Sequence, residues 1–552
     1  MSFEPGHAAL LATAICFFFI GHIYLCLGRP QRARSAAEWV LTALMVGAIG
    51  SIVFAIGAVV VFGPLDVWVG RMIIAGPALA GALGMAFAPS MRLSHVLNTH
   101  CDGLPIPKVT TRLERYSRLL LIAFSAGVIF TASASPVHLF DSVFHFGYKG
   151  RVMFTEGIGG AAWTDLDGVL GRIMTHPKYP PGVSAMEVVP SWFLGHFDAS
   201  AARGLFSIFA LAPAIWIFAA LRSRGRLAAT FGALTWLTVP LLFYLHLPLG
   251  QTLHSIYGLG LGSGLSEDIY TKLVFESSRD PELTARNLRN MFLSVWKSPD
   301  GGGMDGSADL PLAACLFGAL VHLWRVLPGN SVESDRTDWT IGTLMLAGML
   351  LMKNEGGAYL ILMGIALLSA VTITARGNLG PTLRIMIPRL GAVFTIAIVL
   401  ASPWFLVRGS IPEVDENYPA QLTLENVVSV VSEPLEGLES EGASGYAPVI
   451  VAKRFIVALA NPLKWNLLWL TFTATLAWCV ICARKRLLGD ALLPVLIVLL
   501  GSATYFTILV VAPWDYEALF RMGIPERLFI HVASPAVLAT FAMLWCAPDE
   551  LP

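Results

Sequence analysis

Apolar runs recur along almost the whole chain, and each is about as long as one helical crossing of a lipid bilayer, roughly 17–25 residues. About thirteen such runs can be marked. They lie near 8–28, 38–63, 69–89, 119–139, 203–222, 227–248, 310–327, 338–352, 356–375, 388–407, 465–483, 491–512 and 527–546. The sequence therefore predicts an all-α polytopic membrane protein with about thirteen transmembrane helices, in a range of about 11–14.

The composition supports this fold class. Of the 552 residues, 55% are hydrophobic and only 13% are charged, whereas a soluble domain carries roughly a quarter charged residues. A chain this apolar cannot bury its hydrophobic surface in one water-soluble core. The formal net charge is zero, and the sequence has no basic tract and no zinc-like cysteine pattern, so we expect no nucleic-acid partner.

Short basic loops predict the orientation, because such loops stay in the cytoplasm. Basic clusters, such as those at 222–226 and 484–486, follow every second predicted span, so all of them lie on the same side of the membrane. This alternation places the N-terminus outside and the C-terminus inside. Three long loops, at 140–202, 249–309 and 408–464, then lie on the non-cytoplasmic side, where we expect them to be partly helical.

The most unusual polar stretch directly follows the apolar run 119–139. It carries an aspartate, a histidine, a lysine and an arginine just past a predicted membrane exit: Asp141, His145, Lys149 and Arg151. Such groups are costly to dehydrate, so we expect them to work in a wet cavity at the membrane interface. The alternative interpretation is an ordinary interfacial anchor with chance acidic residues.

A second motif lies in the same outer loop, at 172–182. Its prolines remove backbone donors and bias the preceding residues toward extended geometry, so a helix is disfavoured there. The segment predicts a rigid turn that presents three polar side chains, those of His176, Lys178 and Tyr179.

A third motif, Lys353-Asn354-Glu355-Gly356, separates two apolar runs that could also form one kinked helix. A lysine and a glutamate with no other polar cover are expected to pair with each other or to face a polar cavity. The alternative is a purely structural ion pair at a helix break.

A fourth motif precedes and enters the last apolar run, and it contains Trp514, Arg527 and His531. Arg527 and His531 are four residues apart, so on a helix they share one face. That face is expected near the outer membrane surface.

In this order, the four motifs resemble those of the GT-C class of membrane glycosyltransferases, which includes protein O-mannosyltransferases and lipid A aminoarabinose transferases. The resemblance covers roughly 119–546, a catalytic transmembrane module with the three long outer loops. Residues 1–118, with about three helices, would be an N-terminal addition. Lys178 stands where many relatives carry an acid, and Asp515 rather than a histidine follows Trp514.

The resemblance implies a glycosyltransferase that moves a sugar, with inversion, from a polyprenyl-phosphate donor to a glycan, lipid or protein acceptor. Asp141 is the candidate general base for the acceptor hydroxyl, a contribution of about 10²–10⁴ in rate. The leaving phosphate needs fixed cations opposite that base. The candidate phosphate ligands are Lys353, Arg527, Lys149 and Arg151.

The other polar residues of the motifs are candidate substrate-binding groups. These are His145, His176, Lys178, Tyr179, Glu355, Trp514 and His531. No spacing of histidines and acids fixes a metal site, so no metal ligand and no certain cofactor is assigned, and a divalent metal is left open.

We expect an integral protein of the bacterial inner (plasma) membrane that builds cell-envelope glycans, with its active site facing the periplasm or the exterior. The alternative function is a polytopic transporter or flippase of a lipid-linked or anionic substrate. A transporter should gather its ionisable residues near the midplane of broken helices, often with repeat symmetry.

Overall fold

The computed structural model describes most of the predicted spans and part of the long loops. The described residues are 5–28, 35–92, 111–134, 145–160, 163, 176–239, 242, 308–327, 336–375, 379–412, 425, 428–429, 434–435, 445–511 and 524–545. Within these ranges the chain is almost entirely helical, and two paired strands of two residues each complete it.

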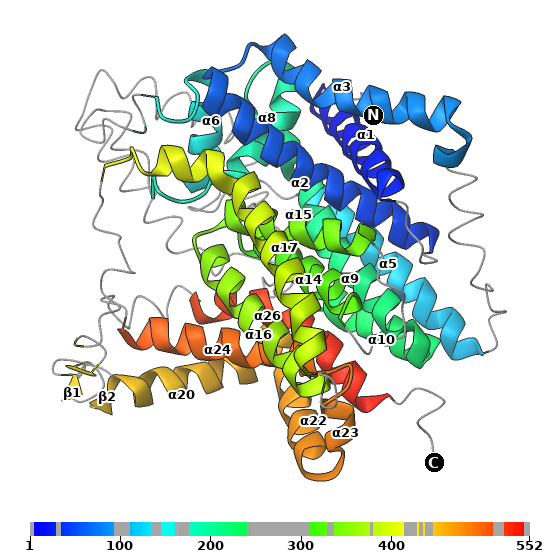
Figure 1. The fold of residues 1–552 in the computed structure, drawn as a ribbon, viewed down its shortest axis with the longest axis vertical. Coiled ribbons are helices and arrows are strands. Elements are labelled where there is room, and N and C mark those ends of the chain that lie inside the picture. Colours follow the sequence, from blue (N-terminus) through cyan, green and yellow to red (C-terminus); the bar gives the residue numbers. More distant parts are fainter. Residues whose placement is uncertain are drawn as a thin grey trace, which may run out of the picture.

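The first half of the chain contributes four long helices, then two short helices from the first outer loop, then a tight helical hairpin (Figure 1). The elements are α1 (Pro5–Leu27), α2 (Ala36–Phe62), α3 (Val67–Phe87), η1 (Pro89–Met91), α5 (Arg112–Ala134), α6 (Tyr148–Thr155), α8 (Gly182–Leu194), η4 (Ala199–Leu205), α9 (Phe206–Leu221), η5 (Arg222–Arg224) and α10 (Arg226–Leu237).

The second half is a series of helices, of which α20 and α24 run across α16 and α17 in Figure 1, with the two strands and α20 at one margin of the molecule. The elements are α14 (Asp309–Arg325), α15 (Arg336–Met352), α16 (Glu355–Thr374), α17 (Leu379–Arg408), β1 (Pro434–Leu435), β2 (Gly445–Tyr446), α20 (Ala447–Ala460), α21 (Pro462–Trp465), α22 (Leu468–Cys482), α23 (Arg484–Leu487), α24 (Leu492–Val511) and α26 (Ile524–Leu544).

The predicted class, an all-α integral membrane protein, is confirmed. In the described part of the chain nine helical segments are long and apolar enough to cross a bilayer. Four further predicted spans coincide with the shorter helices α10, α14, α15 and α22, of 12, 17, 17 and 15 residues. The number thirteen is therefore not confirmed, whereas a helix does lie within the described residues of each predicted run.

The helix α2 lies inside the helical bundle and packs against helices from both halves of the chain. It contacts α1, α8, α9, α15 and α17. The N-terminal helices are thus part of the same buried core as the rest of the described protein.

Glycines allow α1 and α2 to approach each other very closely. A methyl group on Gly21 would overlap the carbonyl oxygen of Ala43, and one on Gly47 would overlap the carbonyl oxygen of Phe17. Each helix therefore places a glycine against the backbone of the other. Small residues at such crossings let dispersion contacts form along the whole interface, which is how helices associate in lipid.

The helices α14 and α15 run antiparallel, and each end of this pair is marked by polar contacts between different helices. At one end Lys353 follows α15 and contacts Asp309 at the start of α14. At the other, Arg325 near the end of α14 pairs with Glu38 at the start of α2, with an N–O distance of 3.2 Å. We call these the Lys353 end and the Arg325 end. Which of them faces the cytoplasm stays a prediction.

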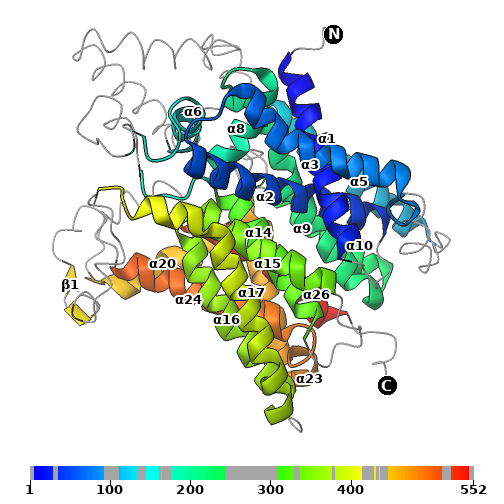
Figure 2. The same ribbon diagram turned by 45° about the horizontal axis from the view of Figure 1, so that its top comes forward.

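The short helices α6 and α8 lie at the Lys353 end, beside the end of α2 in both views (Figures 1 and 2). Arg71 of α3 ties α8 to this end, donating from Nε to the Trp192 carbonyl oxygen at 2.6 Å. At the start of α8, a methyl group on Gly182 would overlap the Leu351 carbonyl oxygen in the last turn of α15. The first outer loop is therefore built into the bundle.

We predict that Gly47→Ala destabilises the detergent-solubilised protein by about 1–3 kcal/mol, because its methyl group forces α1 and α2 apart. The measurement is the thermal unfolding midpoint of the purified protein. Gly76→Ala in α3 is the matched control, since nothing lies within 4 Å of a methyl group there. Equal midpoints for the two variants would contradict a close crossing at Gly47.

Candidate functional site

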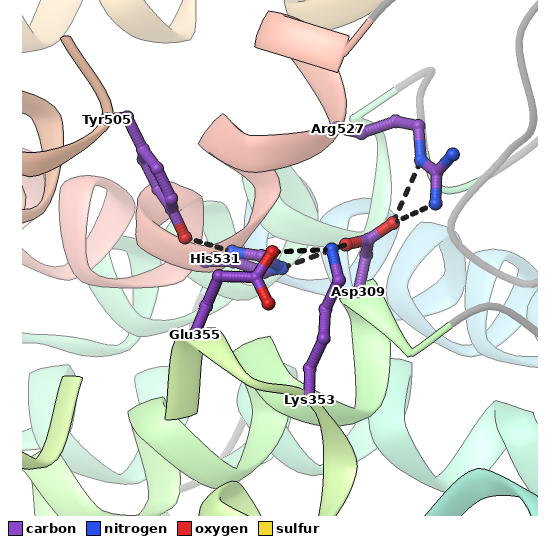
Figure 3. A network of polar contacts seen from close by, with 6 residues as sticks. All are labelled: Asp309, Lys353, Glu355, Tyr505, Arg527 and His531. Atoms are coloured by element: carbon purple, nitrogen blue, oxygen red, sulfur yellow. Dashed lines mark hydrogen bonds and ion pairs between the residues drawn. The ribbon is translucent and has the colours of Figure 1, made fainter. Parts of the chain in front are cut away.

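The centre of the polar network at the Lys353 end is the carboxylate of Asp309. Asp309 is the first residue of α14, and only 3% of its surface is exposed. An ionised carboxylate in such a position needs compensating charge and hydrogen bonds. Two other segments supply these partners, the turn after α15 and the helix α26, as Figure 3 shows.

Each oxygen of Asp309 binds two donors. Oδ1 accepts from Lys353 Nζ at 2.9 Å and faces His531 Nε2 at 3.1 Å. Oδ2 accepts from Arg527 Nε at 2.9 Å and from Arg527 Nη2 at 2.8 Å. Donors at these distances to an ionised acceptor form the stronger class of hydrogen bond. The carboxylate therefore holds two cations and an imidazole in fixed positions.

The partners of His531 assign its tautomer. Asp309 as a carboxylate can only accept, so His531 Nε2 carries the proton and donates. Nδ1 then accepts from the hydroxyl of Tyr505 in α24, which hydrogen-bonds to it. Both side chains are buried. The chain Tyr505–His531–Asp309 thus links α24 and α26 to the first turn of α14.

Glu355 adds a second carboxylate on the other side of Lys353, with an N–O distance of 2.9 Å. Dehydration alone would lower the pKa of Lys353, but Asp309 and Glu355 outweigh it and hold that pKa above its ordinary value. Lys353 is therefore charged. With Arg527 it balances the two carboxylates, two positive charges against two negative ones.

The helix break at Lys353 depends on the glycine of its motif. A methyl group on Gly356 would overlap the carbonyl oxygen of Met349 in the preceding helix. The turn between α15 and α16 is closed by a hydrogen bond from the Gly356 amide to the Lys353 carbonyl oxygen at 3.0 Å. The predicted Lys353–Gly356 motif is thus a tight connection between two separate helices, not one kinked helix.

A second polar group lies close by, around the predicted proline-rich turn. The ring centroids of His145 and His176 are 4.1 Å apart, and the His176 ring stacks on Tyr179 at 4.7 Å. Tyr179 is also close enough to Lys353 for the two side chains to interact electrostatically. Residues from the first and second predicted motifs therefore lie beside those of the third and fourth.

The predicted site residues divide into three sets by their position. Lys353, Glu355, Arg527 and His531 meet at Asp309, and His145, Lys149, His176 and Tyr179 meet at the turn. Lys178 and Arg151 are half-buried, at the turn and in α6 respectively. Asp141 and Trp514 lie outside the described residues, so their placement stays a prediction.

Lys149 is more deeply buried than is expected of a residue that binds an incoming phosphate. Its side chain is fully buried, and its Nζ donates to the His176 carbonyl oxygen. Burial lowers the pKa of Lys149 well below its ordinary value. This environment does not favour the predicted role in phosphate binding.

Asp309 was not among the residues expected from the sequence. It is the last residue of the predicted outer loop 249–309 and directly precedes an apolar run, the same position relative to lipid that made Asp141 and Arg527 candidates. That criterion, applied to every loop end, would have found it. The pairing with Lys353 and Arg527, 44 and 218 residues away, has no signal in the sequence.

Among the described residues, no three histidines, cysteines, aspartates or glutamates come together as ligands for a metal ion. The predicted His145 packs against the rings of His176 and Tyr179.

No protein-family model, no curated protein and no solved structure matches this chain. The geometry of the site is therefore what supports a function.

We predict that Asp309→Asn lowers the free energy of unfolding by roughly 3 kcal/mol, because it leaves two cations against a neutral group. Chemical or thermal unfolding in detergent measures the change. Asp490→Asn is the matched control at the Arg325 end: Asp490 is 42% exposed, and its partner Arg224 also donates to the Ala542 carbonyl oxygen. The control should cost at most about 1 kcal/mol, and similar small losses in both variants would refute a stabilising role for Asp309.

Proposed function

We propose that the protein is an inverting membrane glycosyltransferase that takes its sugar from a polyprenyl-phosphate donor. The acceptor is a hydroxyl of a glycan, lipid or protein on the non-cytoplasmic side. The proposal joins the resemblance of four motifs to the GT-C class with the network at the Lys353 end.

The observation that carries the proposal is one buried carboxylate holding two cations that are themselves partly exposed. Asp309 is 4% exposed as a side chain, whereas Lys353 is 11% and Arg527 is 25% exposed. Preorganised cations of this kind stabilise negative charge that develops on a leaving group. Arginine offers a two-pronged donor to phosphate and lysine a compact charge.

Membrane position favours a lipid-borne phosphate over a soluble one. Lys353 directly follows the apolar last turn of α15, and α26 continues from Arg527 as a candidate span. A prenyl chain in the bilayer could therefore leave its phosphate at this depth. A water-soluble nucleotide sugar would gain nothing from such a position.

The proposed reaction is one in-line displacement. The acceptor hydroxyl oxygen attacks the anomeric carbon and loses its proton to Asp141. The bond from that carbon to the phosphate oxygen breaks, and its electron pair leaves with the polyprenyl phosphate. Lys353 and Arg527 stabilise the added negative charge, while Asp309 and Glu355 fix their positions. Attack opposite the leaving group inverts the anomeric configuration.

We predict that Asp141→Asn lowers the rate of sugar transfer by about 10²–10⁴, because the amide cannot accept the acceptor's proton. The assay follows transfer from polyprenyl-phosphate sugars by the purified protein in lipid. Asp167→Asn, a change of the same kind in the same loop, should transfer at nearly the wild-type rate. An Asp141→Asn variant as fast as wild type would remove this residue as the base.

Arg527 gives a second prediction. Arg527→Gln should weaken inhibition by added polyprenyl phosphate at least about tenfold, because a charge-assisted contact to the phosphate is lost. Arg527→Lys keeps the charge without the planar fork and should fall between the two. The exposed Arg336, at the Arg325 end, supplies the control Arg336→Gln. Unchanged product inhibition in Arg527→Gln would contradict phosphate binding there.

A different observation favours the alternative, a transporter or flippase of a lipid-linked or anionic substrate. The Arg325 end carries its own buried network: Arg325 contacts Glu38 and Asp338, and Asp338 lies 2.5 Å from His322 Nδ1. Ionisable groups buried among helices are often part of an ion or substrate path. Charged networks at both ends of the same helix pair suit a protein that opens alternately to each side.

Proteoliposomes distinguish the two functions. A transporter or flippase moves an intact lipid-linked sugar between leaflets with no acceptor present, and Asp338→Asn should abolish that movement. The transferase instead needs an acceptor, releases polyprenyl phosphate and depends on Asp141. Movement without transfer would overturn the transferase proposal.

A further inference from the structure

Lys149 is a buried amine that contacts a backbone carbonyl group and two aromatic rings. It lies in α6 and is fully buried, and its Nζ donates to the His176 carbonyl oxygen. The centroids of the Trp163 and Tyr179 rings are 5.8 Å and 5.6 Å from Nζ. Buried against these two rings, the amine is removed from water. The contact with His176 is therefore shielded from competing solvent.

The His176 carbonyl oxygen is the centre of the turn. It also accepts from the Tyr179 amide at 2.9 Å, so the four residues 176–179 form a hydrogen-bonded β-turn. His176 itself has a φ of 51°, in the left-handed region. That conformation costs a residue other than glycine roughly 1–3 kcal/mol and persists only where the surroundings hold it. The Lys149 side chain donates a hydrogen bond to the carbonyl group of this strained residue.

The turn is built against the site. Immediately after it, Gly182 begins α8 in close contact with the backbone of Leu351, two residues before Lys353. Tyr179, at the last position of the turn, stacks on the His176 ring, with its own ring centroid 5.6 Å from Lys149 Nζ. Ser184 Oγ further ties α8 to the segment that leads into α6, donating to the Phe146 carbonyl oxygen at 2.9 Å. A shift of the turn would therefore move α8 against the last turn of α15, which leads into the helix break at Lys353.

We propose that Lys149 is a positioning residue that clamps the 176–179 turn against the Lys353 break. The clamp itself follows from the contacts around His176. Its consequence, that Tyr179 and Lys353 are held in place for a lipid-linked phosphate donor, rests on the proposed function. Lys149 does not touch the donor.

Two substitutions separate hydrogen bonding from packing. Lys149→Met keeps an unbranched apolar side chain but removes the donor. Lys149→Gln keeps a neutral donor for the His176 carbonyl oxygen, at the cost of burying more polar surface. If Lys149 only fills space, the Met variant should resemble wild type more closely than the Gln variant. If Lys149 is a clamp, the order is reversed.

Hydrogen exchange at the turn is the direct readout. Residues 177, 180 and 181 are prolines, so a peptide covering 176–181 reports few amides, and that of Tyr179 is hydrogen-bonded. In Lys149→Met the Tyr179 amide should exchange about tenfold faster than in wild type. In Lys149→Gln the increase should be smaller. The clamp would be overturned if the Tyr179 amide exchanged at the wild-type rate in Lys149→Met, or if it exchanged more slowly in Lys149→Met than in Lys149→Gln.

Kinetics test the consequence for the site. For sugar transfer from a polyprenyl-phosphate donor, kcat/KM should be highest in the wild type, lower in Lys149→Gln and lowest in Lys149→Met. A Met variant with faster exchange and unchanged kcat/KM would refute the positioning role. If wild-type protein transfers no sugar from any such donor, the proposed function fails, while the exchange order still decides the clamp. Should the Met variant not fold, Lys149→Leu, which also lacks the donor, takes its place in the same comparison with Lys149→Gln.

Discussion

The carboxylate of Asp309 is the one charge on which the arrangement of helix ends depends. Removed from water, it is stable only where cations and hydrogen-bond donors surround it. Lys353, Arg527 and His531 provide these from the turn after α15 and from α26. Replacing such a buried ion pair by apolar groups is often neutral for stability, but breaking it is costly. Its effect is thus to select one arrangement of α14, α15, α16 and α26 over others of similar packing.

The same helix pair is fixed again at its other end. α14 carries Asp309 in its first turn and Arg325 in its last, and 17 residues at about 1.5 Å per residue separate the two by roughly 25 Å. α15 carries Asp338 near its start, and Lys353 follows its last residue. A sliding movement of α14 against α15 would therefore break ionic contacts at both ends at once, although the surfaces between them are apolar and could slip.

Close backbone approaches complement these charges. Gly21 and Gly47 let α1 and α2 touch, Gly182 sets α8 on the last turn of α15, and Gly356 lets α16 follow α15 after a short turn. In lipid, where apolar surface gains little by association, such contacts and interhelical polar groups carry much of the specificity. They also bring the 176–179 turn to the polar network, where Lys149 holds it.

The sequence by itself determined the class of the protein and most of the polar groups that matter. Apolar runs mark helices, and a charge placed beside such a run is expensive unless it has a partner, so the sequence alone marks Lys353, Glu355, Arg527 and His531 as candidates. Only the tertiary structure decided that Asp309 is the acid that joins them and that Lys149 faces a carbonyl group instead of an open site. The physical reason is that the cost of dehydrating a charge is local and can be read from its neighbours in the chain. The partner that offsets this cost comes from a distant segment, and only the packing of the helices brings it near.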